Sequence, residues 1–469
     1  MGGLRGEGAL NQVLELLITK FYWEGKKFMT KEELLEQIES QGIKFIRLQI
    51  TDINGALKNV EIPSTELESS LTNGTMFDGS SIEGLVRINE SDMLLKPDLD
   101  TFTVLPWTVE REKVGRFICD IYASDGKHFQ GDPRYVLKKV MNEMKEYGYT
   151  PYAGPEPEFF ILPRDEETRQ PVLSPLDKGG YFDLLPIDLG ERVRKNMVET
   201  LQSMGIRVEA AHHEVANSQH EIDFRYDNAL RTADNIQTFK LVVRTIALLN
   251  GLWATFMPKP FFGMNGSGMH THLSIFKDGK NIFYDPNGTY QLSNELRWFI
   301  GGVFKHIDSI TVLANPTINS YKRLVPGYEA PVNIAWSVSN RSALVRIPMS
   351  RGEGTRLELR SPDPTANPYL LLASVFSAGL EGIKNKIEPP QPVDGNIYEM
   401  DHREKNEKNI RYLPGSLQES LEALKNDKLI KEVLGEHIFE KFIELKEKEI
   451  EEFKIAVTDW EINKYINQF

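Results

Sequence analysis

Several segments of this chain place ionisable side chains at every second residue, and this alternation constrains the fold most. In residues 270–275, His270, His272 and Ser274 are separated by single residues, and in residues 356–360 Arg, Glu and Arg alternate with two leucines. Successive side chains of a β-strand point to opposite faces. The pattern therefore predicts strands with one face against a core and the other face directed at a polar site.

Two glutamates in Gly154-Pro-Glu156-Pro-Glu158 occupy the same face of another such segment. Two parallel carboxylates repel each other unless a proton or a cation lies between them. Residues 159–161, Phe-Phe-Ile, indicate burial, which raises the cost of leaving the pair unneutralised. A lone Glu or His is more often a packed or ion-paired residue, but several segments offer them here. A shared site for a hard divalent cation is predicted.

Arg341 and Arg346, in Asn340-Arg-Ser-Ala-Leu-Val-Arg346, are candidates for a phosphate clamp. Their spacing places them on opposite faces of a regular strand, so either a bend intervenes or only one of them reaches the site. Two surface arginines are the alternative. Carboxylates and a histidine around cations, with arginines nearby, suit phosphoryl transfer. The sequence has no P-loop motif, no dinucleotide-binding glycine motif at a helix start and no Gly-x-Ser-x-Gly elbow.

Composition narrows the possible partners. A chain of 469 residues is expected to form at least two domains. Its net charge of −13 argues against nucleic acid or an anionic membrane as the main partner. Cys119 is the single cysteine, which excludes an intrachain disulfide and fits the cytoplasm. The most apolar stretch, residues 369–380, is too short to cross a bilayer and predicts a buried helix.

The chain is expected to have three parts, of mixed α+β class. Residues 1–28 are interpreted as an extension, either poorly ordered or translated upstream of a start at Met29, with a helix packed on the body as the alternative. Residues 29–130 are predicted to form a small domain with a helix over 31–41 and a strand over 44–51. Asp132 and Pro133 indicate the start of a helix, and the third part is predicted to be residues 131–469.

The end of the chain is strongly helical over residues 415–455 and then carries an apolar tail. Trp460, Ile462, Tyr465, Ile466 and Phe469 lie within ten residues of each other. So much apolar surface at a terminus requires a partner that buries it. A second subunit is the preferred partner, and docking on the chain's own domain is the alternative.

Seven motifs together resemble the glutamine synthetases of the bacterial and archaeal type I class. They are Phe77-Asp78-Gly-Ser-Ser81, Gly154-Pro-Glu-Pro-Glu158, His213-Glu214, Asn265-Gly-Ser-Gly-Met-His270, the segment from Asn319 to Pro331, Asn340-Arg-Ser, and Arg356-Leu-Glu-Leu-Arg-Ser-Pro-Asp-Pro364. The resemblance extends from Met29 to the end of the chain. It implies a β-grasp N-terminal domain and a catalytic domain with a curved antiparallel sheet flanked by helices. It also implies a homo-dodecamer of two hexameric rings with active sites shared between subunits, and a tail inserted into the opposite ring.

The resemblance assigns the reaction and its ligands. ATP phosphorylates the γ-carboxylate of L-glutamate, and ammonia attacks the γ-glutamyl phosphate to give L-glutamine, ADP and phosphate. Two to three Mg²⁺ or Mn²⁺ ions per site are implied. One ion would bind Glu158, Glu214 and Glu221, and another would bind Glu156, His270 and Glu358. Glutamate would bind Asn265, Gly266, Arg323 and Arg360. ATP and its phosphates would bind Tyr226, His272, Ser274, Arg341, Arg346 and Arg356.

The amination step also receives residues by resemblance. Ammonium is a cation without a lone pair, so it needs a negative pocket and a base that takes a proton. Asp78 resembles the base, supplied by a neighbouring subunit, and Ser81, Tyr181 and Glu214 surround it. Glu329 resembles a flap that shields the acyl phosphate from water, and with Asp78 and Arg341 it forms the catalytic set.

Two further segments of the sequence bear on regulation, and two alternative functions are considered beside the implied one. Ser80-Ser-Ile-Glu-Gly-Leu-Val-Arg87 resembles the subclass in which this arginine transmits inhibition by glutamine, whereas the surroundings of Tyr398 do not resemble an adenylylation site. One alternative is a γ-glutamyl–amine ligase, against which the Phe77–Ser81 loop and Glu329 argue. The other is an inactive regulator, which is expected to lack at least one metal ligand, although regulatory protein partners remain compatible with activity.

Overall fold

The computed structural model describes residues 30–82, 84, 92–338, 340–393, 395, 397 and 399–469. The predicted extension at 1–28, the predicted regulatory Arg87 and Tyr398 lie outside these residues. The chain divides into two compact units. The first holds the described residues up to Gln49, with Asn59–Met76 and Leu94–Cys119, and the second holds Ile50–Lys58, the described part of 77–93 and Asp120–Phe469.

The N-terminal sheet has the strand order β2-β1-β6-β4-β3, with β5 paired to β6. Its strands are β1 (Phe45–Thr51), β2 (Leu57–Pro63), β3 (Thr75–Asp78), β4 (Asp92–Pro97), β5 (Thr103–Val104) and β6 (Val114–Ala123). β1 and β6 are parallel, and helices α2 (Lys31–Ser40) and α3 (Leu67–Asn73) accompany the sheet. Thr30 and Glu33 close a capping box at the start of α2. The predicted helix, strand and β-grasp class are confirmed.

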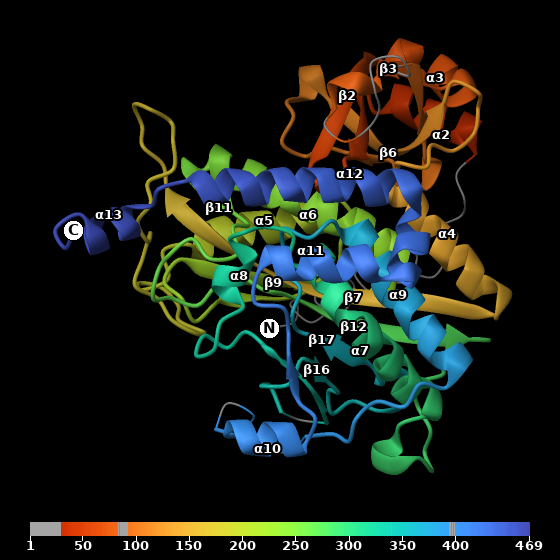
Figure 1. Ribbon diagram of the computed structural model, residues 1–469. Helices are drawn as coiled ribbons and strands as arrows, with labels where there is room; N and C mark the ends of the chain where they lie inside the picture. Colours follow the sequence, from red (N-terminus) through yellow and green to blue (C-terminus); the bar gives the residue numbers. More distant parts are fainter. Residues whose placement is uncertain are drawn as a thin grey trace, which may run out of the picture. The chain divides into compact units, whose positions relative to one another are not determined.

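The large sheet has the order β15-β16-β17-β12-β7-β9-β8 (Figure 1). The long strand β7 (Tyr149–Pro163) is central: it pairs antiparallel with β12 (Met269–Lys277) along its first half and with β9 (Gln219–Phe224) along its second. The other strands on this path are β8 (Val208–His213), β15 (Trp336–Ser337), β16 (Val345–Arg346) and β17 (Leu357–Leu359). β15 and β16 form a parallel pair. Short strands β10 (Asp227–Asn228), β11 (Leu252–Thr255) and β13 (Lys280–Asn281) join the sheet, and β14 (Asn333–Ile334) pairs with β18 (Arg411–Tyr412).

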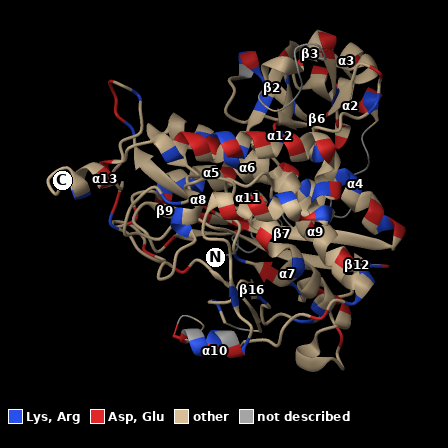
Figure 2. Ribbon diagram, viewed as in Figure 1, with Lys and Arg blue, Asp and Glu red and all other residues tan. Residues whose placement is uncertain are grey.

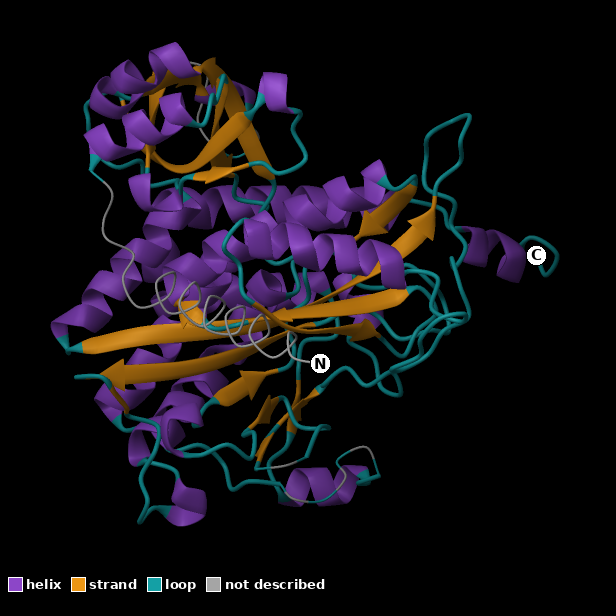
Figure 3. Cartoon of the chain, turned by 180° about the vertical axis from the view of Figure 1, so that it is seen from behind, coloured by secondary structure: helices purple, strands orange, loops and turns teal. Residues whose placement is uncertain are grey.

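Helices of the second unit cover one side of the large sheet, as the view from behind shows (Figure 3). The helices described in this unit are α4 (Pro133–Glu146), α5 (Glu191–Ser203), α6 (Ala229–Leu249), α7 (Asn294–Ala314), α8 (Ser320–Arg323), α9 (Pro368–Asn385), α10 (His402–Glu407), α11 (Leu417–Asn426), α12 (Lys428–Ile455) and α13 (Asp459–Tyr465). Of these, α10 and α13 lie apart from the layer that covers the sheet (Figure 1). Helix α9 is buried along most of its length, as residues 369–380 predict. Within the described residues, no helix has the length and apolar character to span a bilayer.

The predicted helix start at Asp132 and Pro133 and the predicted helical segment over 415–455 are both confirmed. Asp132 accepts a hydrogen bond from the backbone of Arg134 at 2.9 Å, and Pro133 is the first residue of α4. Acidic and basic side chains are interspersed along α12 (Figure 2). Helix α13 projects at the end of the chain, where Trp460 is 63% exposed and Phe469 is fully exposed. The tail therefore does not dock on the described part of its own chain.

Candidate active site

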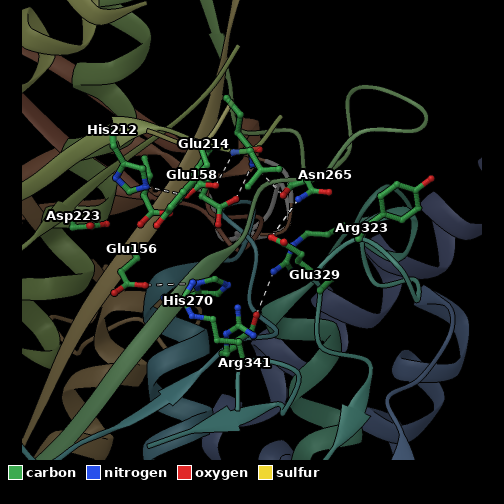
Figure 4. A pocket seen from close by; sticks show the side chains of 18 of the residues that line it. Glu156, Glu158, His212, Glu214, Asp223, Asn265, His270, Arg323, Glu329 and Arg341 are labelled. Carbon is green, nitrogen blue, oxygen red and sulfur yellow. Dashed lines mark hydrogen bonds and ion pairs between the residues drawn. The ribbon is translucent and has the colours of Figure 1, made fainter. Parts of the chain in front are cut away.

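The open face of the large sheet carries a cavity of about 610 Å³. Strands β7, β8, β9, β12, β16 and β17 contribute to its wall, because the alternating residues of each strand direct their ionisable side chains to the same side. Figure 4 shows Glu156 and Glu214 on one side and Arg323 opposite. The cavity is lined by all six carboxylates and imidazoles predicted as metal ligands: Glu156, Glu158, Glu214, Glu221, His270 and Glu358.

One set of candidate ligands comes from three adjacent strands. Glu156 of β7 lies opposite His270 of β12, and Glu358 is on β17 beyond it. His270 Nδ1 lies 3.6 Å from Glu156 Oε2 and 3.8 Å from Glu358 Oε1. Burial opposes ionisation of Glu156, but hydrogen bonds from His270 and His272 outweigh it and lower the pKa of that carboxyl. This set has the one imidazole and two carboxylates that suit a hard divalent ion.

The second set brings the carboxylates of Glu158, Glu214 and Glu221 close together. Glu158 of β7 lies opposite Glu221 of β9, and Glu214 directly follows β8. Burial and the charge of Glu214 raise the pKa of Glu158 to about 8, and burial and the charge of Glu158 raise the pKa of Glu221. Such carboxylates become stable anions when a cation lies among them. The residues present therefore fit a metal ion.

The structure adds two side chains to this second set that the sequence analysis missed. His212 and Asp223 bring their ligand atoms within 4.8 Å of Glu221 and of each other, and His212 Nε2 lies 2.9 Å from Glu214 Oε1. Asp223 Oδ1 is buried and has no hydrogen-bond partner among the residues that the structure describes. A signal was present, because His212 is two residues before Glu214 and Asp223 is two residues after Glu221. The same alternation that identified Glu156 and Glu158 applies to them.

Arg323 and Arg360 contribute positive charge to the wall of the first cavity. Arg323 is 3% exposed, and its guanidinium donates to the carbonyls of Ser361, at 2.7 Å, and Arg360, at 3.2 Å. A Cβ on Gly266 would lie 2.2 Å from the Pro258 carbonyl, and one on Gly268 would lie 2.6 Å from the Arg323 guanidinium. At Gly266, where the nearest atom belongs to the backbone, only glycine allows this close approach. Arg323, Arg360, Asn265 and Gly266, the predicted glutamate set, all line the cavity.

The open question about Arg341 and Arg346 has a structural answer. Residues 341–344 form a turn and β16 begins only at Val345, so a bend intervenes and both side chains line the cavity. Arg346 contacts the carboxylate of Glu358 directly, and Arg341 approaches Tyr181 closely enough to influence its hydroxyl. Burial and the charge of Glu214 raise the pKa of Tyr181 above its ordinary value.

Glu329 is on a loop over the same cavity. Its backbone has a φ of 61°, a left-handed conformation that is uncommon outside glycine. Asn265 Nδ2 donates to Glu329 Oε2 at 3.3 Å, so the carboxylate faces the predicted glutamate set. Lys259 Nζ lies 3.6 Å from the centre of the neighbouring Tyr328 ring.

A second cavity, of about 270 Å³, collects the predicted nucleotide residues Tyr226, His272, Ser274 and Arg356. Arg356 Nε donates to His272 Nδ1 at 3.1 Å, and His272 Nε2 lies 2.7 Å from Glu156. Glu156 and Asp223 line both cavities. The smaller cavity therefore adjoins the first one at Glu156 and Asp223.

Asp78 and Ser81 are the predicted site residues that line neither of these two cavities. Asp78 instead accepts hydrogen bonds from the backbone and hydroxyl of Ser80, at 2.9 and 2.6 Å. These bonds lower the pKa of Asp78, so its carboxylate is ionised and available as an acceptor.

Comparisons with known proteins agree with this arrangement. The family model "Glutamine synthetase, catalytic domain" matches residues 130–465, and "Glutamine synthetase, beta-Grasp domain" matches residues 42–124. A glutamine synthetase from Thermotoga maritima is 60% identical over 438 residues, covering 93% of this chain and 100% of that protein. One from Thermus thermophilus is 56% identical over 441 residues, covering 93% and 99%. The cryo-EM structure of Plasmodium falciparum glutamine synthetase matches with a TM-score of 0.83 at 29% identity, covering 94% and 99%.

Proposed function

This chain belongs to the glutamine synthetase family and makes glutamine from glutamate, ammonia and ATP, and we propose that its two adjoining cavities perform that reaction with the residues assigned below. The observation that carries the proposal is the first cavity itself. It places six candidate metal ligands beside the arginines Arg323, Arg341 and Arg360. Phosphoryl transfer to a carboxylate needs both, because phosphates and the substrate carboxylate are all anionic.

The family uses divalent metals with ATP, and the two ligand sets are the places for them here. Glu158, Glu214 and Glu221 form the set nearer glutamate and ammonium, and Glu156, His270 and Glu358 form the set nearer the ATP phosphates. When bound there, two to three Mg²⁺ or Mn²⁺ ions would neutralise the negative charge of the ATP phosphates. The hydrogen bonds and ion pairs from His272, Arg346 and Arg360 hold Glu156 and Glu358 in place.

Glutamate binds between Arg323, Arg360, Asn265 and Gly266. Arg323 already donates to two backbone carbonyls, which fixes its guanidinium at the cavity wall. The adenine and ribose enter the second cavity beside Tyr226, His272 and Ser274. Arg341, Arg346 and Arg356 stabilise the transferring phosphate by charge. The acyl phosphate then forms near Glu329, whose flap excludes water before ammonia arrives.

Ammonium binds where Glu214 and Tyr181 meet, and Asp78 takes its proton. Asp78 and Ser81 come from a neighbouring subunit, which is supported by the fact that neither residue lines the two cavities of its own chain. The exposed apolar tail of α13 is a second surface that requires a partner. These two features support a type I homo-dodecamer of two hexameric rings. Single cysteine usage, with Cys119 buried, supports a cytoplasmic location.

Regulation is proposed on sequence alone. Arg87 transmits feedback inhibition by glutamine, Tyr398 is not adenylylated, and both residues lie outside the described part of the chain. Regulatory protein partners are compatible with this reading.

Subunit mixing tests the shared site directly. Asp78→Asn and Arg323→Ala are each expected to abolish most glutamine formation. If sites form between neighbours, one subunit of each kind restores an intact site at some interfaces. Random reassembly of equal amounts is expected to restore about a quarter of the parental activity, measured as phosphate release that depends on ATP, glutamate and ammonium. No recovery on mixing would place both residues in a site within one chain.

A further inference from the structure

A group of five buried side chains lies next to strands β8 and β9, on the side of the sheet away from the cavity. Glu214 follows β8, and Glu221 is part of β9. We call this group the buried ion-pair cluster, and its members are Asp177, Asp188, Arg194, His213 and His220. Asp188, His213 and His220 are 0% exposed. His213 and Glu214 are neighbours in sequence, as are His220 and Glu221, and His213 lies opposite His220 across β8 and β9. The two imidazoles lie on the face of the sheet opposite to the cavity, since neither His213 nor His220 lines it.

The cluster has the composition of a metal site, but its hydrogen bonds leave no imidazole lone pair for a metal. His213 Nδ1 lies 2.7 Å from the Glu214 carbonyl, and its Nε2 lies 3.2 Å from Asp177 Oδ1. Both ring nitrogens of His213 are therefore already engaged by oxygen atoms of the protein. Arg194 donates to His220 Nδ1 at 2.8 Å, so the proton of His220 is on Nε2. Arg194 also pairs with Asp188 at 2.8 Å and supplies the positive charge that an ion would bring.

The cluster joins three segments that meet at the cavity. Asp177 Oδ1 accepts from the backbone of Ser218, at 2.9 Å, which fixes the turn between Glu214 and β9. Asp177 also accepts from the backbone of Gly179 and Leu189, at 3.2 Å each, which fixes both ends of the loop that carries Tyr181. The backbone of Phe182 in that loop donates to the His213 carbonyl at 3.0 Å.

Two glycines show how closely the Tyr181 loop is fitted to the imidazoles. A Cβ on Gly179 would lie 2.5 Å from His213 Nε2, and one on Gly190 would lie 2.4 Å from His220 Nε2. These distances are shorter than any van der Waals contact, so the loop can approach the rings only with glycine at both positions.

We propose that the buried ion-pair cluster is a positioning device, which holds Glu214, Glu221 and Tyr181 in the arrangement that metal and ammonium binding require. None of its five residues lines either of the two cavities. They act through the Glu214 carbonyl, the turn at Ser218 and the loop backbone, which is how outer-shell groups orient metal ligands. The inference rests on the proposed function, in which Glu214 and Glu221 are metal ligands.

A titration of the full-length protein with Mn²⁺, read by the electron paramagnetic resonance signal of free Mn²⁺, tests the inference. Asp177→Asn is expected to keep the number of bound ions but to weaken one class of site by roughly 10–100-fold, as outer-shell substitutions do. Excess Mn²⁺ is expected to restore kcat in this variant. Glu221→Gln is expected to lose that class of site, and this separates failure of the ligand assignment from failure of the positioning role.

The matched control is His306→Gln, which removes a buried histidine that also lies between two carboxylates, at 2.7 Å from each. It is expected to lower the melting temperature without changing Mn²⁺ binding. Parental Mn²⁺ affinity in Asp177→Asn would reduce the cluster to a structural role and overturn the proposal. Loss of a bound ion in Asp177→Asn, beyond the ion lost in Glu221→Gln, would make the cluster itself a metal site and would also overturn it. If Asp177→Asn does not fold, Asp188→Asn is titrated and judged by the same outcomes.

Discussion

Glu358 is the anion on which several cationic side chains of the cavity converge. It is 2% exposed, it pairs with Arg346 and, at 3.1 Å, with Arg360, and it lies 3.8 Å from His270. Burial alone would raise the pKa of Glu358, but the charges of His270, His272, Arg360 and Arg346 outweigh it and lower the pKa. Its carboxylate is therefore the counter-charge for two arginines, and in the proposed function it is also a metal ligand.

The Glu358→Gln substitution is expected to weaken metal binding and to remove the negative charge that pairs with Arg346 and Arg360. Phosphate release in the presence of ATP, glutamate and ammonium should fall at least about 100-fold, because a ligand charge is lost beside the phosphates. The free energy of unfolding should fall by roughly 3–5 kcal/mol, the cost of leaving buried cations unpaired. Glu388→Gln is the control, since Glu388 pairs with Arg297 at the surface at 2.5 Å. Normal phosphate release by Glu358→Gln would contradict its place in the metal set.

At the scale of helices and strands, alternation was the signal that sequence could supply. Alternation predicted that Glu156, His270 and Glu358 lie on strand faces that meet at one site, and all three line one cavity. With a period of two, a strand that buries its apolar residues must direct the residues between them to the opposite face. Alternation could not give the turn at 341–344, because which bend a loop adopts depends on the elements that it joins. It also did not reveal the buried ion-pair cluster, since Asp177 reaches His213 across 36 positions of sequence.

The helical layer has an ion triad of its own at His306. This residue of α7 bonds Glu381 of α9 and Asp427, which caps the start of α12. Burial would lower the pKa of His306, but its hydrogen bonds to Asp427 and Glu381 outweigh burial and raise the pKa above 6.5. The folded state therefore binds this proton more tightly than the unfolded state. Its stabilisation is complete below the unfolded pKa and is lost as the pH rises through the folded pKa.

His306→Gln is expected to lower the free energy of unfolding by roughly 1.5–3 kcal/mol in mildly acidic solution, about one hydrogen bond to a charged group. The difference from the parent protein should shrink as the pH increases from about 5 to about 9, because the parent loses the same charge. Urea unfolding at a series of pH values measures it. A difference that stays constant or grows with pH would show that His306 is neutral in the folded protein.

For the whole molecule, the tail is the feature that a single chain leaves unexplained. Trp460 is 63% exposed, Ile466 68% and Phe469 101%, although Thr458 and Glu461 form a complete capping box that makes α13 a defined helix. An ordered helix with an exposed apolar surface is typical of an element that packs on another subunit. The dodecamer proposal gives it that partner in the opposite ring.

Deleting residues 459–469 is therefore expected to separate the two rings while each ring keeps its shared sites. The molar mass measured by light scattering should fall to about half, since an interface that loses its apolar anchors rarely persists. Activity per subunit should fall far less than in Asp78→Asn, because the dodecamer proposal places each shared site within one ring. Leu249→Ser is the matched control: Leu249 is 63% exposed on α6, as Trp460 is on α13, so it tests for a general effect of removing surface apolar groups. An unchanged mass after the deletion would mean that the rings associate through another surface and that the tail has a different partner.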